Sequence, residues 1–213
     1  MPITVFVADD HAIVREGLAS LLGAQADMQV VGTAADGRDA VRQIAKLSPE
    51  VVVMDIAMPD MNGIEAAREL RERVPQVRVI ILSMHSSAEH VFHALEAGAL
   101  GYLLKESAAR EIIAAVRAVR AGHRYLGKTI VEVMANNVSR SSASSPLASL
   151  SARERQVLQL VAEGRSSAQI AATLHLSPKS VDTYRSRLMQ KLRIGDVAGL
   201  VKFAIQHGLT SLE

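Results

Sequence analysis

Short apolar runs alternate with amphipathic stretches along roughly the first 120 residues of the chain. The runs are rich in β-branched residues, which is typical of parallel strands that are covered on both faces. Between them, apolar residues recur at helical spacing, as in 38–45 and 111–119. The predicted strands are 3–8, 29–34, 51–54, 77–82 and 101–104. This alternation predicts an α/β fold with a doubly wound, five-stranded parallel sheet in the order 2-1-3-4-5.

The last 65 residues carry only helical patterns and predict a separate, all-α domain of four helices. Ser151 and Glu154 have the spacing of a capping box in front of an apolar run that Gly164 ends. Ser177 suits an N-cap, and Pro178 suits the first position of the third helix. The helices after the first are predicted at 167–174, 178–191 and 196–206.

A stretch of low complexity separates the two patterns. Ser139–Pro146 is mostly serine and cannot bury a core, so we predict a flexible linker there. The residues 129–137 just before it are apolar enough for a short helix. We therefore expect a first domain at 1–123, a partly helical and then Ser-rich linker at 124–148, and a second domain at 149–213.

Composition excludes several classes of protein. With 49% hydrophobic and 22% charged residues, the 213-residue chain has the make-up of a soluble globular protein. The absence of cysteine excludes disulfide scaffolds, thiolate metal sites and cysteine nucleophiles. No apolar run reaches the ~18–20 residues of a membrane span, and residues 1–4 do not resemble a signal peptide. We therefore expect a cytoplasmic protein that does not contact a membrane.

The net charge of +2 conceals an asymmetry between the two predicted domains. Residues 1–123 hold 12 basic and 16 acidic side chains, a balance of −4. Residues 149–213 hold nine basic and five acidic side chains, a balance of +4. Opposite balances indicate different partners, and a basic helical domain favours nucleic acid. Three Phe, three Tyr and no Trp argue against a stacking platform for single strands, which leaves double-stranded DNA.

Acidic side chains follow two strands that are neighbours in the predicted sheet. Asp9 and Asp10 come after the first strand and Asp55 after the third, so their carboxylates converge at the carboxyl edge of the sheet. Such a cluster of oxygen ligands suits Mg²⁺. Ser83 ends the fourth strand and Lys105 the fifth, which adds a hydroxyl and an ammonium. Together these groups are suited to phosphoryl transfer with an aspartate as nucleophile.

The segments that carry these groups resemble the receiver domain of two-component response regulators, which has a flavodoxin-like fold. The matching segments are Val7–His11, Val53–Gly63, Leu82–Ser83 and Gly101–Lys105. The resemblance implies that Asp55 is the phosphoacceptor and that Ser83 and Lys105 bind the phosphoryl group, while Tyr102 swings inward as Ser83 moves. It also implies a Mg²⁺ site made by Asp9, Asp10, Asp55 and the backbone carbonyl of Ala57, with Gly63 as a turn glycine.

Three positions near the predicted site need separate interpretation. Glu106 stands where many receivers have a proline in a cis bond, and a non-proline cis bond costs ~2.5–4 kcal/mol, so we do not expect cis. Neither Ala57 nor His85 is suited to position a hydrolytic water, which predicts a long-lived phosphoryl-aspartate. We interpret His11 as a loop histidine beside the site rather than as a ligand for a transition metal.

The third predicted helix of the second domain has one apolar and one polar face. Its polar side chains are of the kinds that contact phosphates and base edges, although a solvated face of an ordinary helical domain has the same pattern. The segments 150–158, 164–167, 170–171, 176–177 and 180–192 are similar to the LuxR-type helix-turn-helix. Together with the receiver-like part, nearly the whole chain resembles the NarL/FixJ subfamily of response regulators. The resemblance implies DNA contacts by Arg165, Ser166, Lys179, Ser180, Asp182, Thr183, Tyr184, Arg185, Ser186 and Arg187.

Two sets of residues in this domain lead to further hypotheses. Asp182 replaces a basic residue that is frequent in the family, and a carboxylate can accept from cytosine N4, so Asp182 is predicted to affect specificity more than affinity. Val197, Leu200, Val201 and Ala204 in the last helix are a candidate dimer surface on DNA, a candidate part of the small domain's core, or both.

These observations predict a transcription regulator rather than a dedicated enzyme. A sensor histidine kinase would phosphorylate Asp55, and the protein would then dimerise and bind promoter DNA through helix 178–191. One alternative is a phosphatase of the haloacid-dehalogenase type, which needs a second acid where this chain has Ala57. The other is a receiver that is never phosphorylated, against which the five groups Asp9, Asp10, Asp55, Ser83 and Lys105 argue.

Overall fold

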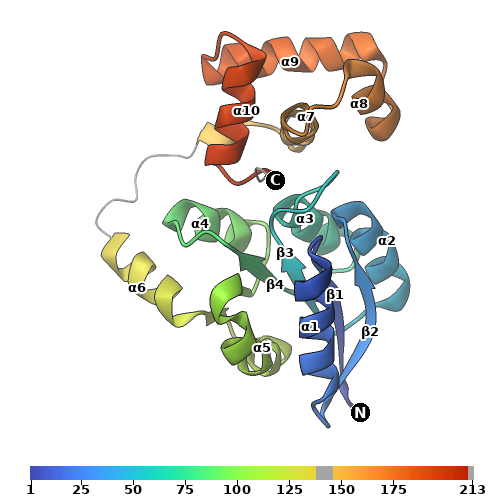
Figure 1. Cartoon of the computed structure of the whole chain (residues 1–213), viewed down its shortest axis with the longest axis vertical. Helices are drawn as coiled ribbons and strands as arrows, with labels where there is room; N and C mark the ends of the chain where they lie inside the picture. The colour runs from blue at the N-terminus through green and yellow to red at the C-terminus, as the bar shows by residue number, and fades with distance from the viewer. Residues whose placement is uncertain (138–145, 211–213) are drawn as a thin grey trace. The chain divides into compact units, whose positions relative to one another are not determined.

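A computed structural model describes residues 1–137 and 146–210 of the chain. These residues belong to two compact units, Met1–Ser141 and Ser142–Glu213 (Figure 1). Within the described ranges, no helix is long and apolar enough to cross a membrane.

The first unit is built on a parallel sheet in the order β2-β1-β3-β4-β5-β6. Its strands are β1 (Ile3–Ala8), β2 (Met28–Ala34), β3 (Val51–Asp55), β4 (Arg78–Ser83), β5 (Gly101–Leu104) and β6 (Tyr125–Leu126). The first five confirm the predicted strands and their order. The two-residue β6 extends the edge beside β5.

Helices cover both faces of this sheet (Figure 1). They are α1 (Ala12–Gly23), α2 (Gly37–Leu47), α3 (Gly63–Arg73), α4 (Ala88–Glu96), α5 (Lys105–Arg120) and α6 (Lys128–Asn137). Alternate residues of β1 point to opposite faces: Val5 and Val7 pack with α1 and α5, whereas Phe6 and Ala8 pack with α2, α3 and α4. The doubly wound fold is therefore confirmed.

Part of the predicted linker is structured. The expected short helix is α6, and its Ile130 is buried in the core that includes α4. With β6 paired to β5, the range 124–137 packs on the first unit. The boundary at 123 stays a prediction. Of the Ser-rich stretch, 139–145 lies outside the described residues, and Pro146 begins the 3-10 helix η1 (Pro146–Ser149).

The second unit contains the four predicted helices. They are α7 (Ala152–Ala162), α8 (Ser167–Leu174), α9 (Pro178–Leu192) and α10 (Val197–Gln206). Ser151 and Glu154 form the expected capping box, and Ser177 caps α9 with Pro178 in its first turn. One apolar core holds the helices together, through buried side chains such as Val157, Ile170, Val181, Leu188 and Leu200.

Candidate functional site

The register of the parallel strands brings the acidic, hydroxyl and ammonium groups to one edge of the sheet. Ala8 of β1 pairs with Met54 of β3, so the next residues, Asp9 and Asp55, lie side by side. Ser83 of β4 pairs with Leu104 of β5, so Lys105 follows directly beside it. Groups that are up to 96 residues apart in the chain therefore meet at the carboxyl ends of adjacent strands.

The ammonium of Lys105 connects two buried carboxylates. Its Nζ lies 2.8 Å from Asp55 Oδ2 and 2.9 Å from Asp9 Oδ2. Asp9 is 0% exposed and Asp55 is 2% exposed. Two anions with so little water need a nearby cation, and Lys105 supplies it.

Burial controls the electrostatics of this site. It raises the pKa of Asp55 to about 6, against the lowering effect of Lys105 and with a smaller raising effect from Asp9. Burial acts to lower the pKa of Lys105, but the ion pairs with Asp55 and Asp9 outweigh it, so this pKa lies above its ordinary value. A pKa of about 6 leaves most Asp55 carboxylates ionised at neutral pH.

The carboxylates fit a divalent cation. Asp9, Asp10, His11 and Asp55 each offer a ligand atom, and these atoms all lie within 4.8 Å of one another. Hard oxygen donors dominate the set, as Mg²⁺ requires. Ala57 is partly exposed in the loop between β3 and α3, and its carbonyl stays a predicted ligand.

Two residues, the N-cap His11 of α1 and Arg15 within α1, contact the acidic cluster. His11 Nδ1 lies 2.6 Å from Asp10 Oδ1 and 3.3 Å from Asp9 Oδ1. Arg15 Nη1 donates to the backbone carbonyl of Asp9 at 2.6 Å. The sequence marked His11 as a neighbour of the site, but it gave no signal for Arg15, since this contact depends on where α1 packs.

Ser83, His85 and Tyr102 form a connected group beside Asp55. The backbone N–H of His85 donates to Ser83 Oγ at 2.9 Å, and the Tyr102 hydroxyl donates to the His85 carbonyl at 2.7 Å. Tyr102 is 0% exposed, so its ring already lies inside, the position that the resemblance associates with an inward swing. Burial raises the pKa of Tyr102 to about 12, a hydrogen bond with Ser83 opposes this, and the charge of Asp55 adds to it.

Local backbone geometry explains two of the predicted features. A Cβ on Gly63 would lie 2.1 Å from the carbonyl oxygen of Asp55, so only glycine fits at this turn beside Asp55. Lys105 is the first residue of α5, directly after β5. The peptide bonds within the described ranges are all trans, including the one between Lys105 and Glu106.

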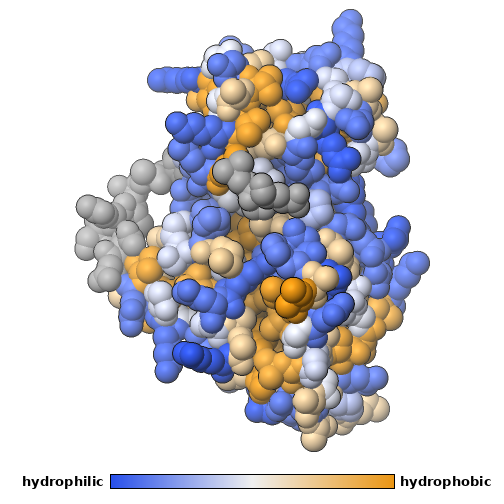
Figure 2. All heavy atoms as spheres, viewed as in Figure 1, coloured by the Kyte–Doolittle hydropathy of each residue, from blue (hydrophilic) through white to orange (hydrophobic). Residues whose placement is uncertain are grey.

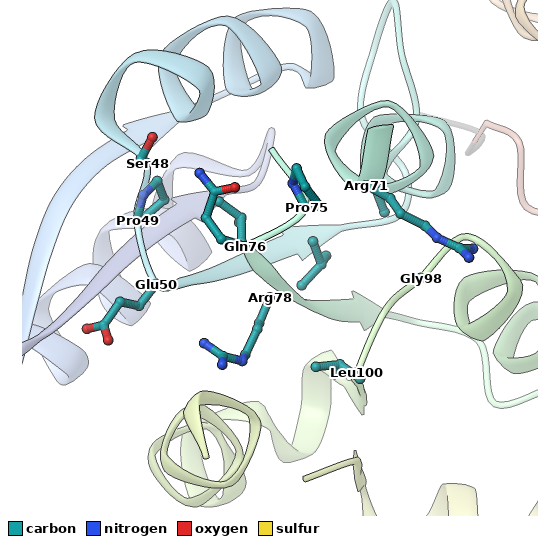
Figure 3. A pocket seen from close by; sticks show the side chains of 12 residues that line it. Ser48, Pro49, Glu50, Arg71, Pro75, Gln76, Arg78, Gly98 and Leu100 are labelled. Carbon is teal, nitrogen blue, oxygen red and sulfur yellow. The ribbon is translucent and has the colours of Figure 1, made fainter. Parts of the chain in front are cut away.

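A second hollow lies at the opposite edge of the sheet, near the amino ends of β3 and β4. It has a volume of about 520 Å³ and is lined by Glu50, Arg71, Arg78 and their neighbours (Figure 3). Arg71 Nη1 donates to the backbone carbonyl of Glu96 at 3.1 Å. Glu50 Oε1 forms an ion pair with Arg120 Nε at 3.0 Å. Because the acidic cluster is at the carboxyl edge, this hollow is separate from the candidate site.

The polar face of α9 is largely exposed, as predicted for a DNA-binding helix. In the view of Figures 1 and 2, α9 runs along the upper edge of the second unit, and hydrophilic side chains project from this edge. Among the predicted contacts, Ser180, Tyr184, Arg185 and, before α8, Arg165 are partly buried. The exposed ones are Ser166, Lys179, Asp182, Thr183, Ser186 and Arg187.

Asp182 has a partner within the protein. Its Oδ1 accepts from Ser167 Oγ at 2.7 Å, and Arg185 Nη1 donates to the same Ser167 oxygen at 3.0 Å. Ser167 is the first residue of α8, so this network joins α8 to α9. The sequence did not reveal this role of Ser167, because the contact depends on the angle between the two helices.

Other contacts hold α9 and α10 on the rest of the unit. Lys191 Nζ lies 2.8 Å from Glu154 Oε2, at the capping box of α7. Burial acts to raise the pKa of Glu154, but hydrogen bonds from Lys191 and Ser151 hold it below its usual value. In α10, Leu200 and Ala204 are fully buried in the core, whereas Val197 is 42% exposed. The core interpretation therefore holds for Leu200 and Ala204.

Comparison with known proteins finds the same two parts. Residues 5–117 match the response regulator receiver domain, and residues 148–204 match the family described as bacterial regulatory proteins, luxR family. Response regulator UvrY of Escherichia coli is 37% identical over 212 residues, 99% of this chain and 97% of UvrY. Oxygen regulatory protein NreC of Staphylococcus carnosus is 36% identical, over 96% of this chain and 98% of NreC. A solved complex of the response regulator RcsB with DNA matches 95% of this chain and 98% of RcsB, with a TM-score of 0.61 and 25% identity.

Proposed function

Since the chain belongs to the two-component response regulators of the NarL/FixJ subfamily, we propose that it is a transcription regulator that a sensor histidine kinase phosphorylates on Asp55. In response, the protein dimerises and binds promoter DNA through α9. The observation that carries the proposal is the buried Asp55 carboxylate, 2.8 Å from Lys105 and next to Asp9 and Asp10. We place the protein in the cytoplasm, where both its kinase partner's active domain and DNA are accessible.

In the proposed transfer, an ionised Asp55 oxygen attacks the phosphorus of the kinase's phosphohistidine. The new O–P bond replaces the N–P bond, whose electron pair goes to the imidazole nitrogen. At pH 7 the pKa of about 6 leaves most Asp55 carboxylates ionised and nucleophilic. Asp9, Asp10, Asp55 and the carbonyl of Ala57 would hold Mg²⁺, which supplies charge neutralisation for the phosphoryl oxygens.

Lys105 and Ser83 are the proposed phosphoryl-binding side chains. Lys105 is already shared between Asp9 and Asp55, so it can bind a phosphoryl oxygen without crossing the site. A phosphoryl group adds a charge of about −1.5 to −2, which strengthens this interaction. Ser83 Oγ accepts from the His85 N–H, so its own proton is available as a donor; it serves the hydrogen bond with Tyr102 in this structure and would turn to the phosphoryl group in the proposed state. A movement of Ser83 toward the phosphoryl group would then displace the His85 backbone and, through it, Tyr102 and α4.

For DNA binding, the exposed polar face of α9 enters the major groove, and a dimer would contact two half-sites about one helical turn apart. Lys179 and Arg187 are exposed and have the charge to contact phosphates or guanine edges. Asp182, held by Ser167, affects specificity by orienting α9 or by accepting from cytosine N4.

The protein's own chemistry ends at phosphorylation and slow dephosphorylation of Asp55. In place of the second acid that a haloacid-dehalogenase phosphatase needs, the chain has Ala57. Neither the methyl group of Ala57 nor the bulk of His85 is suited to position the attacking water, so we propose a long-lived phosphoryl-aspartate. A half-life of seconds at neutral pH would contradict this part of the proposal.

The direct test incubates the protein with acetyl phosphate and Mg²⁺ and measures intact mass. The wild type should gain one phosphoryl group, and Asp55→Ala should gain none. Asp60→Ala is the matched control, because Asp60 lies in the same loop but outside the acidic cluster. An unmodified wild type, or a modified Asp55→Ala, would contradict the proposed acceptor.

A further inference from the structure

The loop between β4 and α4 is tied to the candidate site through the backbone of His85. Its N–H binds Ser83 and its carbonyl binds Tyr102, at 2.9 and 2.7 Å. Ser83 is 1% exposed and Tyr102 is 0% exposed, so both partners are fixed in the core. A displacement of this single peptide segment would therefore break or rearrange both hydrogen bonds.

The side chain of His85 is held from the opposite side by α4. Its ring stacks on the ring of His90, with centroids 5.0 Å apart and planes 17° apart. His90 is 5% exposed, in the first turn of α4, and its Nδ1 lies within hydrogen-bond distance of Ser87 Oγ, the N-cap of that helix. A ring anchored in the helix therefore provides a platform for an otherwise exposed loop residue.

We propose that His90 is a positioning residue for the phosphoryl site. Through its stack on His85, it holds the β4–α4 loop in the conformation in which the His85 backbone binds both Ser83 and the buried Tyr102, before any phosphoryl group arrives. The inference rests on the proposed phosphorylation of Asp55 and adds a residue that touches neither the acidic cluster nor the phosphoryl group. Without the stack, the competent loop conformation becomes less populated, and the apparent affinity for a phosphoryl group falls by the same factor.

Beryllofluoride, a tetrahedral mimic of the phosphoryl group, tests the proposal at equilibrium and without hydrolysis. Its binding to the full chain with saturating Mg²⁺ is measured by the chemical shifts of isotope-labelled tyrosine, of which the chain has only three residues. His85→Ala is the cleanest variant, because it removes the ring but keeps the backbone N–H and carbonyl that bind Ser83 and Tyr102. It changes an exposed residue, so the fold should be retained.

The proposal predicts that His85→Ala and His90→Ala each weaken beryllofluoride binding by about three- to tenfold, with Mg²⁺ affinity unchanged. The double variant should be no weaker than either single variant, because both remove the same stack. His90→Phe keeps a stacking ring and should bind within about twofold of the wild type. His93→Ala, a similarly buried histidine of α4 that contacts Glu89 and Glu96 instead, should also be within about twofold.

Wild-type affinity in His85→Ala, additive losses in the double variant, or equal losses in His90→Phe and His90→Ala would overturn the inference. Asp55→Asn separates the two levels of the argument. If the wild type binds no beryllofluoride, or if Asp55→Asn binds it equally well, the proposed function itself fails and the inference falls with it. If binding depends on Asp55 but not on the stack, only the inference fails.

Discussion

The two functional surfaces of this chain are built in opposite ways. The candidate phosphoryl site, called the pocket below, brings together Asp9, Asp55 and Ser83 at the carboxyl ends of three strands. Each of these side chains is 2% exposed or less. The proposed DNA-binding surface lies mainly on α9, and side chains such as Lys179 and Arg187 are exposed there. The pocket therefore has an electrostatic cost that the fold must offset, whereas the helix face has almost none. Variants in the pocket should change stability and function together, and variants on the helix face should change function alone.

The largest effect is expected from Lys105→Met, which removes the cation between Asp9 and Asp55. In buffer without Mg²⁺ at pH 7.5, the free energy of unfolding of the first unit should fall by about 3–4 kcal/mol, since two buried carboxylates lose their partner. Urea denaturation followed by circular dichroism measures this change. The matched control is Arg117→Met, which removes a solvent-exposed ion pair with Asp27 and should cost far less, because water screens that pair. Equal losses in the two variants would contradict the account of the pocket.

Asp55→Asn should have the opposite sign and stabilise the first unit without Mg²⁺. The pKa of Asp55 is raised from 3.8 to about 6 in the fold, so between these values the folded state binds a proton that the unfolded state has lost. Wild-type stability therefore falls as pH rises from about 4 to about 6 and then levels off, a total of roughly 3 kcal/mol. The advantage of Asp55→Asn should be smaller at pH 5 than at pH 7.5.

The measurement is a series of urea unfolding curves at pH 5, 6 and 7.5, with Asp60→Asn as the control in the same loop. Mg²⁺ should stabilise the wild type more than Asp55→Asn, because it compensates the buried charge. A destabilised Asp55→Asn, or an advantage that does not vary with pH, would show that burial does not raise this pKa.

Arg187→Ala tests the other surface. Because Arg187 is exposed, unfolding of the second unit should change by less than about 0.5 kcal/mol. DNA affinity should fall about tenfold, and the slope of log affinity against log salt should decrease by about one if the contact is to phosphate. Lys202→Ala on α10 removes the same charge from an exposed position off the α9 face and serves as the control. The assignment of α9 fails if both variants bind DNA with the same affinity.

The smallest effects distinguish two roles of Asp182. If it acts by holding Ser167 and orienting α9, Ser167→Ala and Asp182→Ala should each change DNA affinity by about 1 kcal/mol or less and should not be additive. If it accepts from cytosine N4, only Asp182→Ala should relax the base preference. Selection from a randomised DNA pool measures that preference. An unchanged preference in both variants would exclude both roles in specificity.

Local signals explain what could be predicted from the sequence. N-caps such as Ser151 and Ser177 mark where α7 and α9 begin. Buried parallel strands give continuous apolar runs. Once the order of strands was known, Asp9 and Asp55 had to meet at the carboxyl edge. By contrast, β6 has two residues and forms because the edge of β5 is available for pairing. It is too short to produce an apolar run in the sequence, so it was not predicted.

Contacts between elements were beyond prediction from one sequence. Arg15 reaches the Asp9 carbonyl, His90 reaches His85 and Ser167 reaches Asp182 only because of how their helices pack. In the sequence of its own helix, none of these side chains has a feature that marks it as part of a site. They have in common that they contact a residue in or beside a predicted site, so the sequence indicated the candidate site residues but not the side chains that pack against them.

The central claim is that phosphorylation of Asp55 controls DNA binding by the second unit. The most direct test measures the affinity of the full chain for its promoter DNA before and after treatment with acetyl phosphate and Mg²⁺, for the wild type and Asp55→Asn, with the phosphorylated fraction read from intact mass. Wild-type affinity should rise in proportion to that fraction, and the affinity of Asp55→Asn should not change. A wild type that is fully phosphorylated on Asp55 and binds DNA no better than before would contradict the central claim.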